Sequence, residues 1–160
     1  MQANHRVCGI CGTEKPIDQF AGKRGNQCMP CVTHIRRERN GASPGAWAAY
    51  LVGQAKGNSK RRDDADFELT AEKVLDLWER QEGLCAVSGL PMQHHSAFTD
   101  MNASIDRIDP TVGYKIENAQ LVCWRVNLIK GDLHEAQLLW WLRVLVAHET
   151  KKHRRSSKEA

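Results

Sequence analysis

Residues 103–130 read ASIDRIDPTVGYKIENAQLVCWRVNLIK. The first residues of this stretch alternate between apolar and polar, which predicts a short strand. Pro110 and Gly113 mark a turn, and a second short apolar run follows at residues 119–123. Apolar residues then recur at mixed spacing up to Gly131, which predicts a short helix. The sequence therefore predicts a hairpin followed by a helix.

Length and composition limit the number of domains and the class of protein. The chain of 160 residues has room for one ordinary domain and a small satellite, and its 41% hydrophobic content indicates a folded protein. The most apolar segment, residues 136–147, is interrupted by Arg143 and is shorter than the ~20 residues that cross a bilayer. The first residues, MQANHRVCG, contain no apolar signal core. We expect a soluble, cytoplasmic protein with no membrane partner.

Charge is distributed unevenly along the chain. Residues 1–62 carry eleven Lys/Arg against three Asp/Glu, a net charge of +8. Residues 63–148 carry seven against fourteen, or −7, and residues 149–160 carry five against two, or +3. Basic ends around an acidic middle suit a protein that holds a polyanion at a carboxylate-containing centre. The alternative is that these runs are only solvated surface.

Four of the six cysteines form two CxxC pairs with sixteen residues between them: Cys8, Cys11, Cys28 and Cys31. This spacing is typical of a four-thiolate structural zinc site, and few large apolar residues surround it, so the metal would supply much of the stability. The alternatives are two disulfides or a redox CxxC motif.

Other segments show clear helix and loop signals. Ser43-Pro44 begins a helix that gives way to an exposed basic loop or linker at residues 56–62. Thr70 begins a helix with its apolar residues on one face. The apolar segment that contains Trp140 and Trp141 predicts a helix packed on the core, with both tryptophans in packing roles.

The central stretch resembles a known family. Asp106-Arg-Ile-Asp-Pro110, Gly113, Asn118-Ala-Gln-Leu, Cys123 and Asn127-Leu-Ile-Lys130 are similar, in order and spacing, to the ββα-metal motif of HNH endonucleases. The pattern is closest to small phage and prophage members with Asp-Arg-Ile in place of Asp-His-Ile. It covers about residues 67–133, and the cysteine pairs are similar to the zinc ribbon that precedes such nucleases. The alternative is an Asx-rich hairpin whose Asp106 and Asn127 only cap turns.

The resemblance implies a role for each matched residue. Asp106 and Asn127 would hold one Mg²⁺ or Mn²⁺ ion through hard oxygen ligands. Asn118 would tie the hairpin loop by hydrogen bonds, and Lys130 would reach a phosphate. Arg107 stands where the family has its general-base histidine, and an arginine cannot accept a proton from water.

The proton acceptor is therefore open. Either Arg107 clamps the phosphate and another group is the base, or the protein binds without cutting. The candidate bases are His94, His95, His134 and Asp109. Cys85 and Cys123 lack CxxC partners, and we expect both to be small buried residues.

The resemblance implies an α+β fold with an N-terminal zinc ribbon and a ββα-metal domain flanked by helices. We expect four parts: a zinc-binding module at 1–40, a basic helical connector at 41–66, an HNH-like domain at 67–150 and a basic disordered tail at 151–160. The expected function is a phage-encoded, metal-dependent DNA endonuclease or nickase, a monomer or homodimer, in the cytoplasm of a bacterial host; RNA is not excluded as substrate. The alternative is an inactive HNH-fold binding module. Phosphate contacts are expected from Arg36, Arg37, Arg39, Lys60, Arg61 and Arg62.

Overall fold

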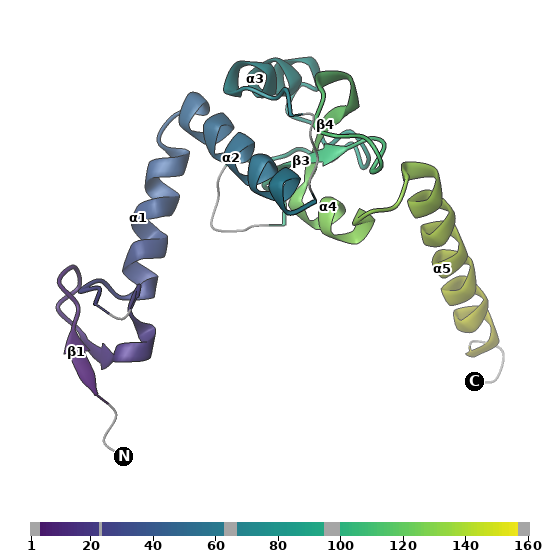
Figure 1. The fold of residues 1–160 in the computed structure, drawn as a ribbon. Helices are drawn as coiled ribbons and strands as arrows, with labels where there is room; N and C mark the ends of the chain where they lie inside the picture. Colours follow the sequence, from purple (N-terminus) through teal and green to yellow (C-terminus); the bar gives the residue numbers. More distant parts are fainter. Residues whose placement is uncertain (1–3, 23, 63–66, 95–99, 157–160) are drawn as a thin grey trace.

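The computed structural model describes residues 4–22, 24–62, 67–94 and 100–156. These residues form an α+β chain whose strands make two separate two-stranded sheets, so the predicted fold class is confirmed. Figure 1 shows a small N-terminal module, a central body, and a C-terminal helix that stands off the body.

The N-terminal module is a hairpin followed by a helix. β1 (His5–Val7) pairs antiparallel with β2 (Glu14–Pro16), and a 3-10 turn, η1 (Ile17–Gln19), follows. Helix α1 (Met29–Gly41) then leads away to the central body. The buried core of the module consists of Cys8, Phe20 and Cys28. Three side chains bury too little apolar surface to stabilise such a unit, so it needs a further source of stability.

Helix α2 (Pro44–Arg62) is longer than the sequence predicts, because the expected loop at residues 56–62 is helical. Trp47, Leu51, Ala55 and Ser59 recur every four residues and are all buried. This stripe runs into the basic segment, and its burial outweighs the weak helix propensity of the Gly and Asn residues there. The basic segment is therefore held against the body.

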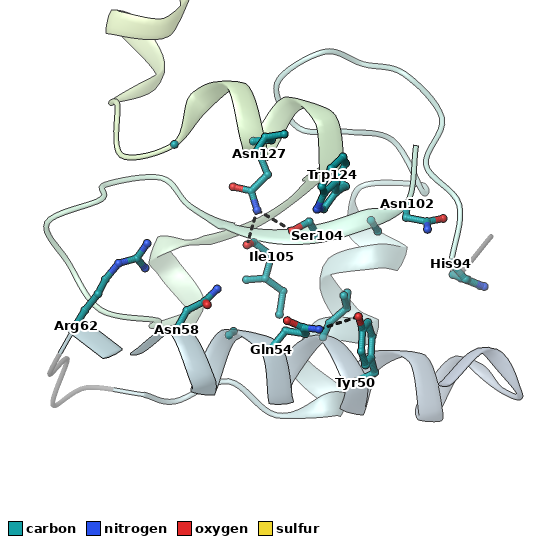
Figure 2. A pocket seen from close by; sticks show the side chains of 15 residues that line it. Tyr50, Gln54, Asn58, Arg62, His94, Asn102, Ser104, Ile105, Trp124 and Asn127 are labelled. Atoms are coloured by element: carbon teal, nitrogen blue, oxygen red, sulfur yellow. Dashed lines mark hydrogen bonds between the residues drawn. The ribbon is translucent and has the colours of Figure 1, made fainter. Parts of the chain in front are cut away.

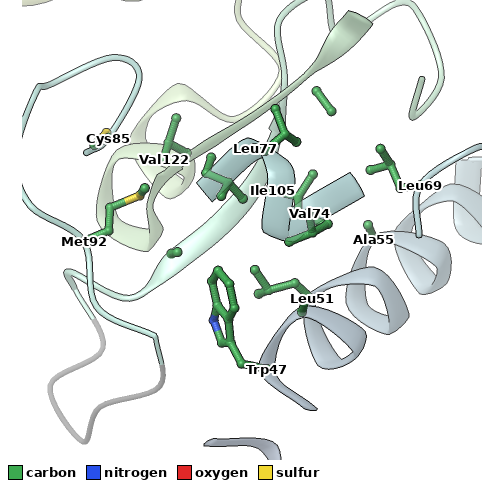
Figure 3. Packing of buried hydrophobic residues seen from close by; sticks show 14 of the residues in the cluster. Trp47, Leu51, Ala55, Leu69, Val74, Leu77, Cys85, Met92, Ile105 and Val122 are labelled. Atoms are coloured by element: carbon green, nitrogen blue, oxygen red, sulfur yellow. The ribbon is translucent and has the colours of Figure 1, made fainter. Parts of the chain in front are cut away.

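Helix α3 (Ala71–Arg80) forms where the sequence predicts it. The Thr70 hydroxyl caps its start by accepting a hydrogen bond of 3.3 Å from the Lys73 N–H. Val74 and Leu77 are buried in the central core. Figure 3 shows Val74 opposite Leu51 of α2, and Leu77 on the side of Ile105 and Val122.

The predicted hairpin and helix are both present. β3 (Ala103–Arg107) pairs antiparallel with β4 (Ala119–Cys123), with Ile105 opposite Leu121. The turn η2 (Ile116–Asn118) precedes β4, and α4 (Trp124–Lys130) follows it directly. Gly131 ends α4 with a φ of +57°, a conformation that glycine adopts without a steric penalty. These elements form a ββα unit, with α2 and α3 packed on it.

Helix α5 (Glu135–Ser156) differs from the expectation in two ways. It extends through residues 151–156, which were predicted to be disordered; residues 157–160 lie outside the described part of the chain. It also does not pack on the core, since among the side chains described for residues 135–152 only Leu138 is buried, while Trp140 and Trp141 are about half exposed. Its apolar residues surround the helix almost completely, so packing one face on the body would still leave apolar residues exposed on the other faces. No helix in the described ranges is long and apolar enough to span a membrane.

Candidate functional site

The four cysteines of the two CxxC pairs meet at one point. Their sulfur atoms all lie within 4.8 Å of one another, with Cys11 and Cys28 Sγ 3.9 Å apart. All four thiols are free in the structure, so the alternative of two disulfides is not seen. This arrangement could hold a structural metal, and four thiolates in a tetrahedron are the donor set of zinc.

Backbone N–H groups near this cluster favour the negatively charged thiolate form of Cys8. The N–H groups of Cys28 and Ile10 lie 3.3 and 3.4 Å from Cys8 Sγ. These donors, Cys28 first, lower the pKa of Cys8 to about 6. A hydrogen bond with Cys28 is the main cause that raises the pKa of Cys31 to about 12. Adjacent thiols cannot all ionise without a cation among them, which is what a bound metal supplies.

A groove separates α2 from the ββα unit. Its volume is about 550 Å³, and it is lined by α2, β3 and α4 (Figure 2). At the Arg62 end it adjoins a smaller crevice of about 60 Å³. Asn58, Arg62, Ile105, Asn127 and Gly131 line both. Asp106, Arg107 and Lys130 line the crevice, so the predicted metal ligands and their basic neighbours share one site.

Asp106 is buried with its charge balanced. Lys130 Nζ lies 3.0 Å from its Oδ1, and Gln120 Nε2 lies 2.9 Å from its Oδ2. The two side chains of the ion pair are 4% and 0% exposed. A carboxylate has about four lone-pair positions, so each oxygen keeps one for a cation.

Lys130 points inward. Besides the Asp106 carboxylate, its ammonium contacts the carbonyl oxygen of Arg107 at 2.8 Å. The sequence predicts a phosphate contact for Lys130, but here the ammonium neutralises the carboxylate instead. The sequence places Lys130 three residues after Asn127 on α4, which fixes the side of the helix on which it lies. Only the packing of α4 on the hairpin shows that this side faces the protein interior.

The amide of Asn127 is oriented by β3. Its Nδ2 donates to Ser104 Oγ at 2.7 Å and to the Ile105 carbonyl at 3.2 Å. With the nitrogen engaged on β3, the carbonyl oxygen is turned to the side on which Arg62 lies (Figure 2). An oxygen in that position can ligate a hard cation.

Asn118 organises the loop between β3 and β4. Its Oδ1 accepts from the Asp109 N–H at 2.8 Å, and its Nδ2 lies 3.0–3.2 Å from the carbonyl oxygens of Asp109, Val112 and Gly113. These contacts tie the loop to itself and fix the strand end that carries Asp106 and Arg107.

Arg107 is also buried, at 7% exposure. Its Nη1 donates to the Val112 carbonyl at 3.2 Å, and its guanidinium lies 5.4 Å from the Tyr114 ring centroid. Tyr114 lines the crevice too, a contribution that the sequence analysis missed. Arg107 places a fixed positive charge in the crevice, and this charge suits a phosphate.

The candidate bases are scattered. His94 stacks against Trp47 and Trp78, with ring centroids 4.6 and 4.5 Å apart, and lines the large groove at the end away from Arg62 (Figure 2). His95 lies outside the described residues. His134 Nε2 is 4.0 Å from Asp109 Oδ1. Of the described residues that line the small crevice, none is a histidine.

Asp109 is half-exposed beside the hairpin turn. Hydrogen bonds from the Thr111 hydroxyl and N–H lower the pKa of this carboxyl from its ordinary value. The carboxylate is therefore charged at neutral pH, and a lowered pKa makes it a weaker proton acceptor.

The predicted phosphate-binding arginines and lysine fall on two helices. Arg36, Arg37 and Arg39 lie on α1, at or near the surface. Lys60, Arg61 and Arg62 form the last turn of α2, where Arg61 donates to Asn58 Oδ1 and Arg62 lines the groove and the crevice. Ala55 and Ser59 continue the four-residue spacing of Trp47 and Leu51, which indicates that the helix extends through the basic segment. This signal could have predicted that Arg62 lies on α2 beside the site.

The remaining two cysteines are buried, as predicted. Cys85 and Cys123 are 2% and 1% exposed and belong to the central core. Burial raises the pKa of Cys123 to about 11. A neutral, enclosed thiol of this kind behaves as a small apolar side chain.

No protein-family model matches this chain, and no curated protein matches it. Among solved structures it is similar to that of the rare-cutting HNH restriction endonuclease PacI, with a TM-score of 0.42 and 19% identity over 94% of this chain and 98% of that one. The residues of the crevice are therefore the basis on which a function is proposed.

Proposed function

We propose that this protein is a metal-dependent endonuclease that hydrolyses phosphodiester bonds in DNA, by nicking or by cutting both strands. One observation carries the proposal. Asp106, Asn127, Arg107 and Arg62 line one crevice, which combines oxygen ligands for a cation with fixed positive charge for a phosphate. RNA offers the same phosphate chemistry and is an alternative substrate.

The ligand set fits a hard divalent cation. Asp106 keeps a lone pair on each carboxylate oxygen, and the Asn127 carbonyl is oriented by Ser104 and Ile105. Two protein oxygens leave coordination positions for water and phosphate, as Mg²⁺ or Mn²⁺ sites require. When bound, such an ion would supply positive charge for the leaving oxygen.

The protein's own residues would position the substrate. Arg62 and Arg107 would hold the phosphate in the crevice, and the basic ends of α1 and α2 would contact the DNA backbone without reading its sequence. Lys130 would hold the Asp106 carboxylate in place. The group that accepts the proton from water is one of His94, His95, His134 or Asp109.

The other parts of the proposal follow from the sequence pattern. The four-cysteine cluster would bind structural Zn²⁺. The motif with Asp-Arg-Ile is similar to that of phage and prophage proteins, so we place the protein in a bacterial host cytoplasm as a phage product.

A second candidate function is supported by Arg107. An arginine at the position of the family's base, in a crevice whose described lining has no histidine, also suits a module that binds nucleic acid without cutting it. The two candidates differ in turnover and not in affinity.

Conversion of supercoiled plasmid to nicked and linear forms tests the proposal. The wild type is compared with Asn127→Ala and Asp106→Asn, with Mg²⁺ or Mn²⁺ added. Asp76→Asn is the matched control, because it removes an exposed carboxylate on α3, outside the crevice. We expect cutting that requires the cation, survives in the control and falls at least roughly 100-fold in the other two variants. Intact plasmid with DNA still bound would establish the binding module instead.

A further inference from the structure

Helix α5 exposes an unusual amount of apolar surface. Six large apolar side chains within one stretch are each 40–66% exposed: Trp140, Trp141, Leu142, Val144, Leu145 and Val146. Half of a tryptophan is roughly 100 Å². The stretch therefore amounts to an apolar patch of the size that marks an interaction surface.

One side of this stretch has the spacing of a helix-pairing seam. Leu138, Trp141, Leu142 and Leu145 follow an i, i+3, i+4, i+7 pattern and lie on one side of the helix. Arg143, the one charged residue among residues 136–147, is two positions from both Trp141 and Leu145 and so falls on the opposite side. The seam is thus apolar along its length.

The two ends of the seam carry opposite charges. Glu135 begins the helix and Asp132 lies in the turn just before it, while Lys151 and Lys152 lie near the other end, where Glu149 offsets part of their charge. In an antiparallel pair of these helices, each acidic end meets a basic end and the helix dipoles also align favourably. In a parallel pair, the two basic ends would lie together and repel.

We propose that α5 pairs antiparallel with α5 of a second copy of this chain, as a two-fold homodimer. The seam is apolar along its length and its two ends carry opposite charges, so it is complementary to a second copy of itself, which a two-fold interface requires. Leu138, at the start of the seam, is buried against the body, but Trp141, Leu142 and Leu145 are 40–59% exposed on a helix that projects from the body in Figure 1, so this part of the seam is open to a partner. The pair would place one basic helix end beside each of the two bodies.

This dimer does not depend on the proposed nuclease activity. Where that activity holds, the assembly carries two crevices and can cut both strands in one encounter. A monomeric active nuclease would overturn only the dimer, and an inactive dimer would overturn only the nuclease.

Molar mass measured by light scattering on the full-length chain gives the first test. We expect the wild type to have twice the chain mass at micromolar concentration, and Leu145→Glu to have the mass of one chain, with dissociation at least roughly 100-fold easier. Leu90→Glu is the matched control, because Leu90 is similarly exposed but lies on the central body. Circular dichroism shows whether each variant is folded.

Charge reversal tests the orientation. We expect Asp132→Lys/Glu135→Lys and Lys151→Glu/Lys152→Glu each to weaken dimerisation roughly tenfold, and the fourfold variant that combines them to restore it. A parallel pair would show no such restoration.

Three results would overturn the proposal: a monomeric wild type, a Leu145→Glu variant that remains dimeric, or charge reversal without rescue. A monomeric wild type that binds anionic phospholipid vesicles through Leu145 would assign the seam to a membrane surface.

Discussion

Lys130 Nζ lies 3.0 Å from Asp106 Oδ1, and neither side chain has more than 4% of its surface exposed. The pair joins the end of α4 to β3 inside the crevice. A buried charge is tolerated only when an opposite charge balances it, so burial of each of these two side chains depends on the other. The carboxylate that we propose as a metal ligand is therefore held ready by a lysine from the motif's own helix.

The stability lost in the two single variants of this pair should add up to more than the stability lost in the double variant. We expect Lys130→Met and Asp106→Ala each to lower the free energy of unfolding by about 3–5 kcal/mol, because an unpaired charge remains buried. The double variant should lose about 2 kcal/mol less than the sum of the two. Urea unfolding measures all three, and simple additivity would show that the pair is not coupled.

Arg62 should contribute to DNA affinity from its place at the crevice. We expect Arg62→Ala to weaken binding roughly tenfold and to lower the slope of log affinity against log salt by about 0.9. Arg80→Ala, at the exposed end of α3, is the control of equal charge change. Fluorescence anisotropy over a salt series measures both. An equal loss in the two variants would mean that only net charge matters.

The four-cysteine module should depend on its metal. Two of its three core residues, Cys8 and Cys28, are expected ligands, so chelation removes the main source of its stability. We expect one zinc ion per chain by elemental analysis, and rapid proteolysis within residues 4–31 after chelation while the central body resists. Cys11→Ser should lose the zinc. Cys123→Ala, which removes a buried thiol outside the cluster, should retain it.

Two glycines should respond in opposite directions to substitution by alanine. Gly83 has a φ of +68°, and a Cβ there would lie 3.0 Å from the Trp78 ring, so Gly83→Ala should destabilise the protein by about 1–2 kcal/mol. Gly53 is helical and exposed in α2, with nothing within 4 Å of an added Cβ. Gly53→Ala should therefore stabilise it by about 0.5–1 kcal/mol. Thermal unfolding compares the two, and a shift of the same sign would contradict the assigned backbone conformations.

Local features of the sequence determined much of this structure. The spacing of the CxxC pairs predicted the thiol cluster, Thr70 marked the start of α3, and the order from Asp106 to Gly131 predicted the hairpin and helix. These features act over a few residues, through capping, turn geometry and ligand spacing, so they can be recognised without knowing what packs against them.

Only the tertiary structure decided the rest. The buried stripe of α2 runs as far as Ser59, so the helix continues to Arg62 and forms a wall of the crevice. Lys130 points inward because its ammonium pairs with the carboxylate of Asp106 on β3. Helix α5 stands away because its apolar residues surround it, and of its described side chains the body fully buries Leu138 alone. Each outcome depends on which distant surfaces become buried together, and burial is a property of the whole fold and not of any one segment.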